Sequence, residues 1–144
     1  MVPNTVKRKL RVLIADDSTA VRQSLARLLN EIENVEVVGQ AQDGAEALTT
    51  IRELKPEVVI LDIRMPGRSG MEVLEGIHQD ERAPKVIVFT NYPFIRYRRK
   101  CLEAGASFFF DKSTEFDQIP QALEQLSRAA TLPDKPTTEA AADP

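Results

Sequence analysis

The sequence alternates regularly between short apolar runs and stretches in which apolar residues recur at helical spacing. The runs are rich in branched and aromatic residues, as buried strands are, and they cover residues 10–15, 35–41, 58–61, 86–89 and 107–110. Between the runs, apolar residues lie three or four positions apart, and a last helical segment begins near residue 117. This alternation predicts an α/β fold, a doubly wound parallel sheet of five strands with helices on both faces. We expect the strand order 2-1-3-4-5.

Local signals mark the ends of the predicted helices. Asp43 with Glu46, and Ser69 with Glu72, have the three-residue spacing of a capping box, in which two side chains satisfy exposed backbone N–H groups. Gly105 follows the fourth helical segment and is the residue type that most often ends a helix. These signals place helices between strands, as the predicted fold requires.

Charged residues stand where three of the apolar runs end. Asp16 and Asp17 follow the first run, Asp62 follows the third, and Lys112 lies just beyond the last. Parallel strands bring their carboxyl ends to one edge of the sheet, where open α/β folds place their sites. Clustered carboxylates repel one another unless a cation lies among them, and oxygen ligands suit Mg²⁺. A carboxylate beside Mg²⁺ and an ammonium group is equipped to take a phosphoryl group.

Length, charge and cysteine content narrow the class of protein. The 144 residues suffice for one domain, and their net charge of −3 gives no global attraction to nucleic acid. The single cysteine, Cys101, excludes an internal disulfide, and we expect it to be a half-buried helix residue without reactivity. We expect no secretory signal and no run long enough to span a membrane, hence a cytoplasmic protein with no membrane partner.

These features together resemble the receiver domain of bacterial two-component response regulators. The resemblance covers residues 10–128 and rests on five positions at strand ends: Asp16, Asp17, Asp62, Thr90 and Lys112. The segment LDIRMPGRSG also has the Met-Pro pair and the glycine of the family at the expected offsets from Asp62. The resemblance implies a flavodoxin-like sheet. We expect residues 1–9 to be an N-terminal extension, 10–130 the receiver domain, and 131–144 a disordered tail.

The resemblance implies a role for most of these residues. Asp62 would be the phosphoacceptor, and Lys112 would pair with a phosphoryl oxygen. Mg²⁺ would be the cofactor, held by Asp16, Asp17, Asp62 and the backbone carbonyl of Arg64. A histidine kinase or a histidine phosphotransfer protein would donate the phosphoryl group. The domain would catalyse only its own phosphorylation and would not be an enzyme that turns over a substrate.

Two further positions would carry the response to phosphorylation. Thr90 would move to hydrogen-bond a phosphoryl oxygen, and Phe109 stands at the aromatic switch position of the family. Three residues depart from the commonest pattern: Phe109 replaces a frequent tyrosine, Asn91 stands where a small residue is usual, and Ser113 follows Lys112 where many receivers have proline. The Lys-Ser pair is more similar to receivers that precede LuxR-type DNA-binding domains.

We expect a stand-alone regulator whose output passes through another protein, either an interaction partner or the next member of a phosphorelay. The downstream target would bind the face between Arg96 and Lys112, where basic residues lie near Tyr92, Phe94 and Tyr97. The alternative for this basic run is a solvated helix face, which the sequence alone favours. Because the run is short and the chain is acidic, we expect no nucleic-acid partner.

Other readings remain open. A haloacid-dehalogenase-like phosphatase also uses an aspartate after a strand, but it carries a second acid two residues later, where this chain has Arg64. A phosphate-independent interaction module could keep the same scaffold, and the departures at Phe109 and Ser113 favour it weakly. At the level of single residues, Asp16 or Asp17 could cap the first helix, and capping could coexist with metal binding because one carboxylate suffices for the cap.

Overall fold

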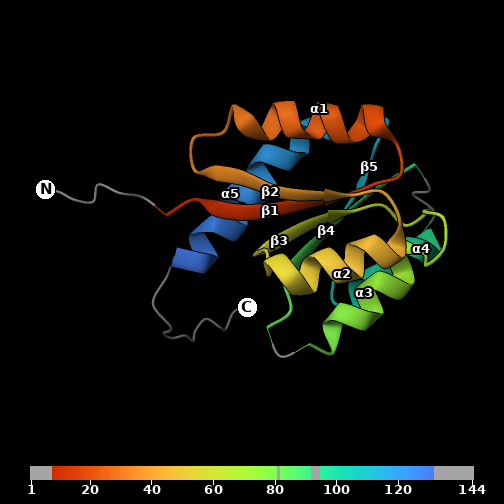
Figure 1. Cartoon of the computed structure of the whole chain (residues 1–144). Helices are drawn as coiled ribbons and strands as arrows, with labels where there is room; N and C mark the ends of the chain where they lie inside the picture. The colour runs from red at the N-terminus through yellow and green to blue at the C-terminus, as the bar shows by residue number, and fades with distance from the viewer. Residues whose placement is uncertain (1–7, 81, 92–94, 132–144) are drawn as a thin grey trace, which may run out of the picture.

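The computed structural model describes residues 8–80, 82–91 and 95–131 (Figure 1). Its centre is one parallel sheet with the order β2-β1-β3-β4-β5, which confirms the predicted topology. The strands are β1 (Leu10–Ala15), β2 (Val35–Ala41), β3 (Val58–Leu61), β4 (Lys85–Thr90) and β5 (Phe108–Asp111). The first three match the predicted runs, β4 extends one residue further at each end, and β5 lies one residue later.

Helices alternate with the strands and cover both faces of the sheet (Figure 1). They are α1 (Thr19–Asn30), α2 (Gly44–Leu54), α3 (Gly70–His78), α4 (Ile95–Glu103) and α5 (Ile119–Thr131). A short 3-10 helix, η1 (Phe116–Gln118), occupies the position at which the last helix was expected to begin, so α5 itself starts two residues later than predicted. Helices α1 and α5 cover one face, and α2, α3 and α4 cover the other.

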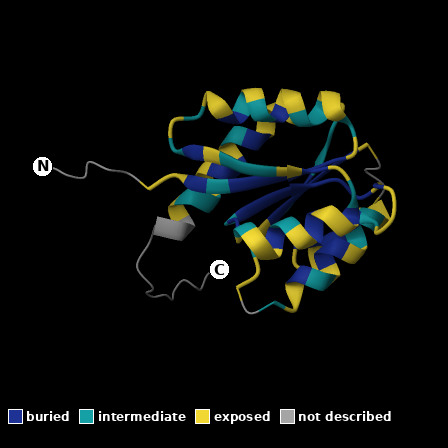
Figure 2. Ribbon diagram, in the orientation of Figure 1, coloured by how far each residue is buried: buried dark blue, intermediate teal, exposed yellow. Residues whose placement is uncertain are grey.

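Alternate residues of the central strands belong to two core layers, one on each face of the sheet. The central strands are buried along most of their length (Figure 2). Leu13, Val59 and Val88 belong to the layer under α2, α3 and α4, whereas Ile14 and Ile60 belong to the layer under α1 and α5. All five side chains are at most 1% exposed. Because both faces of the central strands β1, β3 and β4 are buried, these strands are nearly continuous apolar runs instead of alternating patterns. Polar chemistry is therefore confined to the edges of the sheet.

The predicted capping box is complete at α3 and altered at α2. Ser69 Oγ accepts the N–H of Glu72 at 3.2 Å, and Glu72 Oε1 accepts the N–H of Ser69 at 2.9 Å. Asp43 Oδ1 accepts the N–H of Glu46 at 2.8 Å, but Glu46 Oε1 accepts the N–H of Gln42 at 2.9 Å. This half of the prediction is wrong by one residue, because the Glu46 carboxylate bonds to the residue before the N-cap instead of the N-cap itself.

Helix α4 ends at Glu103, and Gly105 closes its C-terminal end, as predicted. Gly105 has a φ of +109°, and the N–H of Ala106 donates to the carbonyl of Cys101 at 2.9 Å. Cys101 is 0% exposed, so the expectation of a half-buried cysteine is wrong. Helix α4 turns this position onto the sheet, where Cys101 Sγ lies 3.8 Å from Met71 Sδ.

Some expectations concern residues outside the described ranges. These are the N-terminal extension up to residue 7, the tail from residue 132, and Tyr92 and Phe94 of the expected partner face. The domain boundaries therefore stay predictions. Among the described residues, no helix has both the length and the apolar character that crossing a bilayer requires.

Candidate functional site

The hydrogen-bond ladder of the sheet continues into the charged residues that follow the strands. The N–H of Asp16 donates to the last carbonyl of β2 at 3.0 Å, and the N–H of Asp62 donates to the last carbonyl of β1 at 3.0 Å. At the ends of β4 and β5, the N–H of Lys112 donates to the carbonyl of Thr90 at 2.9 Å. Because the ladder fixes these backbones, the predicted residues converge at the carboxyl edge of the sheet.

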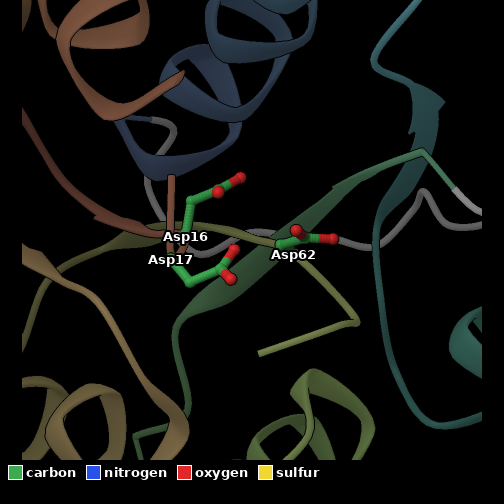
Figure 3. Close-up of side chains that lie close together, drawn as sticks. All are labelled: Asp16, Asp17 and Asp62. Atoms are coloured by element: carbon green, nitrogen blue, oxygen red, sulfur yellow. The ribbon is translucent and has the colours of Figure 1, made fainter. Parts of the chain in front are cut away.

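Three carboxylates meet at this edge (Figure 3). Asp16, Asp17 and Asp62 each offer an oxygen, and these oxygens all lie within 4.8 Å of one another. Asp16 and Asp62 are buried, whereas Asp17 is exposed. Helix α1 is capped by Ser18, whose Oγ accepts the N–H of Val21 at 3.2 Å. The alternative that the two acids serve as the helix cap is therefore wrong for Asp17, and Asp16 only accepts the N–H of Ser18 at 2.9 Å.

Lys112 joins two of the three carboxylates. Its Nζ lies 2.7 Å from Asp16 Oδ2 and 2.9 Å from Asp62 Oδ2. The side chain of Lys112 is 10% exposed, that of Asp16 is 3% exposed and that of Asp62 is 6% exposed. Burial lowers the pKa of Lys112, but the hydrogen bonds to Asp16 and Asp62 outweigh burial and raise the pKa above its ordinary value. Burial also raises the pKa of Asp16, against the opposing effect of the hydrogen bond from Lys112. Lys112 therefore stays an ammonium group at neutral pH.

The charges at this edge suit a divalent cation. Three carboxylates and one ammonium carry a formal charge of −2, and desolvation makes uncompensated charge costly. Among the described residues, no hydrogen bond or ion pair engages the carboxylate of Asp17. A cleft of about 500 Å³ opens over Asp17, Asp62 and Lys112, which leaves room for the water molecules that Mg²⁺ retains. The donor set and the charge fit Mg²⁺.

The loop that leaves Asp62 is held close against it by a glycine. The N–H of Gly70 donates to the carbonyl of Ile63 at 2.6 Å, and a Cβ on Gly70 would lie 1.9 Å from the carbonyl oxygen of Asp62. The N–H of Arg64 lies 3.4 Å from Asp62 Oδ1 at the start of this loop, while the Arg64 side chain is exposed. The close approach keeps the backbone N–H of Arg64 beside Asp62, and the role expected for the Arg64 carbonyl stays a prediction.

The two expected switch residues lie on neighbouring strands. Thr90 is 0% exposed at the end of β4, and Phe109 is 4% exposed in the core layer under α2, α3 and α4. The guanidinium carbon of Arg98, on α4, lies 6.0 Å from the centroid of the Phe109 ring. Arg98 Nη1 also lies 3.5 Å from the carbonyl oxygen of Phe109. Phe109 is thus in contact with the helix that carries the expected partner face.

Sequence reasoning missed a residue that supports the acidic pair. Arg22 on α1 donates from Nη1 to the carbonyl of Asp16 at 2.7 Å, from Nε to Gln40 Oε1 at 3.2 Å and from Nη2 to Thr19 Oγ1 at 3.2 Å. It links the start of α1 to the ends of β1 and β2. No motif marks Arg22, but its place one turn after the Ser18 cap could have suggested that it faces the edge of the sheet.

Comparison with known proteins agrees with this arrangement. The family model of the response regulator receiver domain matches residues 12–124. Response regulator GacA of Pseudomonas aeruginosa is 35% identical over 117 residues, which are 81% of this chain and 55% of GacA. The chain spans about half the length of the curated relatives it matches.

Solved structures show the same likeness. The signal receiver domain of NarL from Mycobacterium tuberculosis is 31% identical and superimposes with a TM-score of 0.79, covering 84% of this chain and 98% of that domain. A LuxR-family response regulator from Aurantimonas sp. SI85-9A1 is also 31% identical, with a TM-score of 0.78 over 84% of this chain and 86% of that one.

Proposed function

The chain belongs to the response regulator receiver domain family, and on this premise we propose that it takes a phosphoryl group on Asp62 from a histidine kinase or a histidine phosphotransfer protein. The observation that carries the proposal is the position of Asp62. One of its oxygens lies 2.9 Å from Lys112 Nζ, and its carboxylate lies beside those of Asp16 and Asp17, under an open cleft.

Phosphoryl transfer needs positioning and charge neutralisation more than covalent help from the protein. An oxygen of Asp62 would form a bond to phosphorus while the bond from phosphorus to the donor atom breaks. The leaving group would keep that electron pair and take a proton from solvent. Lys112 would donate a hydrogen bond to a phosphoryl oxygen. Mg²⁺, held by Asp16, Asp17, Asp62 and the carbonyl of Arg64, would neutralise further oxygen charge when bound.

We propose that Thr90 and Phe109 respond to the phosphoryl group. The modification adds a charge of about −1.5 to −2 and several strong hydrogen-bond acceptors. Thr90 ends the strand beside Lys112, so a small movement of its hydroxyl toward the cleft would meet those acceptors. Because Phe109 touches Arg98, a shift of this ring would be passed to α4.

The proposed output surface is the face of α4 that continues toward Lys112. Ile95 is 75% exposed and Leu102 is 41% exposed, and the basic residues between them are also exposed. Tyr97 is half-buried and packs against the core. This surface suits a downstream protein that offers apolar and acidic groups, whether a regulated target or the next protein of a relay. For these 144 residues we propose protein partners in the cytoplasm, with neither nucleic acid nor membrane as a partner.

We propose that the domain catalyses only the transfer of a phosphoryl group to its own Asp62 and is not an enzyme that turns over phosphomonoesters. The residue two positions after Asp62 is Arg64, whose side chain is exposed. A haloacid-dehalogenase-like phosphatase usually has a second acid there as its general acid and base. Within the described residues, the acids near Asp62 are instead Asp16, which is paired with Lys112, and Asp17.

The test is the intact mass of the protein after incubation with acetyl phosphate, with and without Mg²⁺. The native protein is expected to gain one phosphoryl group only when Mg²⁺ is present, and Asp62→Asn is expected to gain none. Asp117→Asn removes an exposed carboxylate of η1 and is expected to behave as the native protein. Absence of an adduct in the native protein under every condition would overturn the proposal and favour a phosphate-independent interaction module.

A further inference from the structure

The segment that leads from the last residue of β5 into the next loop, residues 111–115, is organised around Asp111. The N–H of Ser113 donates to Asp111 Oδ1 at 2.9 Å, and Ser113 Oγ donates to the same oxygen at 2.7 Å. The carbonyl of Asp111 accepts the N–H of Thr114 at 3.3 Å and the N–H of Glu115 at 2.8 Å. Side chains of this kind, bonded to the backbone two residues on, fix tight turns.

The two other backbone donors of the loop are also satisfied. The N–H of Asp111 donates to Glu115 Oε1 at 2.8 Å, and the N–H of Lys112 donates to the carbonyl of Thr90 at 2.9 Å. All five consecutive N–H groups from Asp111 to Glu115 thus have a partner inside the protein. A segment whose backbone N–H groups are all bonded within the protein has little freedom to move its backbone.

This fixed backbone bears directly on Lys112, which lies between Asp111 and Ser113. The ammonium group must reach Asp16 and Asp62 together, at 2.7 Å and 2.9 Å, from a long side chain with many rotamers. Holding a lysine side chain in one conformation costs less conformational entropy when the backbone of that lysine is already fixed. Ser113 matters because its N–H is one of the donors, and a proline at this position would lack it.

We propose that Asp111 and Ser113 are positioning residues, which hold the backbone of Lys112 so that its ammonium group stands ready for the phosphoryl group on Asp62. This inference rests on the proposed function and deepens it. The hydrogen bonds from Ser113 lower the pKa of Asp111, so its carboxylate stays ionised and keeps accepting both of them at neutral pH.

The test uses variants that separate the acceptor from the charge. Asp111→Ala removes the acceptor and is expected to slow phosphorylation of Asp62 by acetyl phosphate about tenfold, because a small misplacement of a catalytic group costs rate. Asp111→Asn keeps an acceptor oxygen without the charge and is expected to restore most of the rate. Ser113→Ala removes only the hydroxyl donor and is expected to slow the reaction about threefold. The matched control is Asp117→Ala, which loses an equal charge six residues away.

A second measurement does not depend on phosphorylation. The ¹H–¹⁵N signal of the Lys112 ammonium is expected in the native protein, because two hydrogen bonds slow its exchange with water, and Lys112→Met assigns it. The signal is expected to broaden in Asp111→Ala and to persist in Asp111→Asn, while Mg²⁺ affinity stays within about twofold because the carboxylates around it are untouched.

The two proposals fail in different ways. A native protein that gains no phosphoryl group would overturn the proposed function, whereas the ammonium signal would still report on the position of Lys112. A native rate together with an unchanged Lys112 signal in folded Asp111→Ala would overturn the positioning role alone. If Asp111→Ala does not fold, Ser113→Ala decides: an unchanged rate and signal in that variant would also overturn the positioning role.

Discussion

At the scale of single residues, the positive charge of Lys112 does not neutralise the three carboxylates at the edge of the sheet. Lys112 neutralises one of the three carboxylates in formal terms while contacting two, Asp16 and Asp62. Removing one member of a buried ion pair leaves the other uncompensated, which commonly costs about 3–5 kcal/mol. The same arrangement suits phosphorylation, because an incoming phosphoryl group offers the ammonium new acceptors at the place where it already stands.

Cys101 gives a residue-scale prediction that needs no ligand. Its side chain is 0% exposed, and burial raises the pKa of its thiol to about 11. Because the thiolate is the reactive form, we expect the Cys101 thiol of the native protein to react slowly with an aromatic disulfide reagent at neutral pH. Its rate should be limited by the rate at which the protein unfolds locally and exposes Cys101. In denaturant the single thiol is expected to react fully. Rapid stoichiometric labelling of the native protein would contradict the burial of Cys101.

The same thiol sets the sign of a pH effect on stability. The folded state binds this proton more tightly than the unfolded state, whose thiol pKa is near 9.0. The contribution of Cys101 to stability is therefore present below pH 9 and is lost as the pH rises toward 11. Comparing the pH dependence of the unfolding free energy of the native protein with that of Cys101→Ala between pH 9 and 11 measures this contribution of Cys101.

The residues that sequence could predict are those whose place follows from the topology. Asp16, Asp62 and Lys112 stand directly after strands, and the parallel order alone brings them to one edge. Arg22 and Ser113 could not be predicted in the same way. Their partners, a backbone carbonyl and a neighbouring carboxylate, depend on the direction of side chains within a helix and a turn.

At the scale of elements, strands were easier to predict than the connections between them. The polar residues at the two ends of a buried apolar run mark where the strand starts and stops. Three of the five strands match the predicted runs residue for residue. The connections between strands and helices depend on local hydrogen bonds, and alternative sets of these bonds differ little in free energy. Glu46 bonds to Gln42 instead of the N-cap residue, and the 3-10 turn η1 delays α5 by two residues, because each choice rests on one or two bonds.

The loop between β3 and α3 yields a prediction with a matched control. A Cβ on Gly70 would lie 1.9 Å from the carbonyl oxygen of Asp62 and 2.7 Å from the Cα of Ile63, so the backbone must shift in Gly70→Ala. We expect this variant to lose about 2–4 kcal/mol of unfolding free energy in a denaturant titration. Gly67 has a φ of +71° but nothing within 4 Å of its Cβ position.

Gly67→Ala therefore tests backbone strain without the clash. We expect it to lose about 1 kcal/mol, the usual cost of a left-handed alanine. Equal losses in the two variants would show that the close approach of Gly70 to Asp62 does not constrain the loop. A larger loss at Gly70 would tie the stability of this loop to the element that presents the proposed phosphoacceptor.

At the scale of the whole molecule, folding and the acidic edge are coupled through the sheet. Both core layers pack on strands whose carboxyl ends carry Asp16, Asp17 and Asp62 (Figures 2 and 3). Folding therefore forces three carboxylates within 4.8 Å of one another, whereas the unfolded chain keeps the pair at residues 16 and 17 far from Asp62. The repulsion opposes folding, and any cation that binds only the folded arrangement favours it.

This coupling predicts that Mg²⁺ stabilises the folded protein. At a concentration one hundred times its dissociation constant, a ligand specific to the native state adds about 2.7 kcal/mol, which raises the midpoint of thermal unfolding by several degrees. We expect Asp17→Asn to unfold at a higher temperature than the native protein without Mg²⁺, because one repelling charge is gone, and to gain much less from MgCl₂. The control is NaCl at equal ionic strength, which screens charge without occupying the cluster. If NaCl raised the midpoint as much as MgCl₂ did, the stabilisation would be screening alone, and the carboxylates would not form a site for a divalent cation.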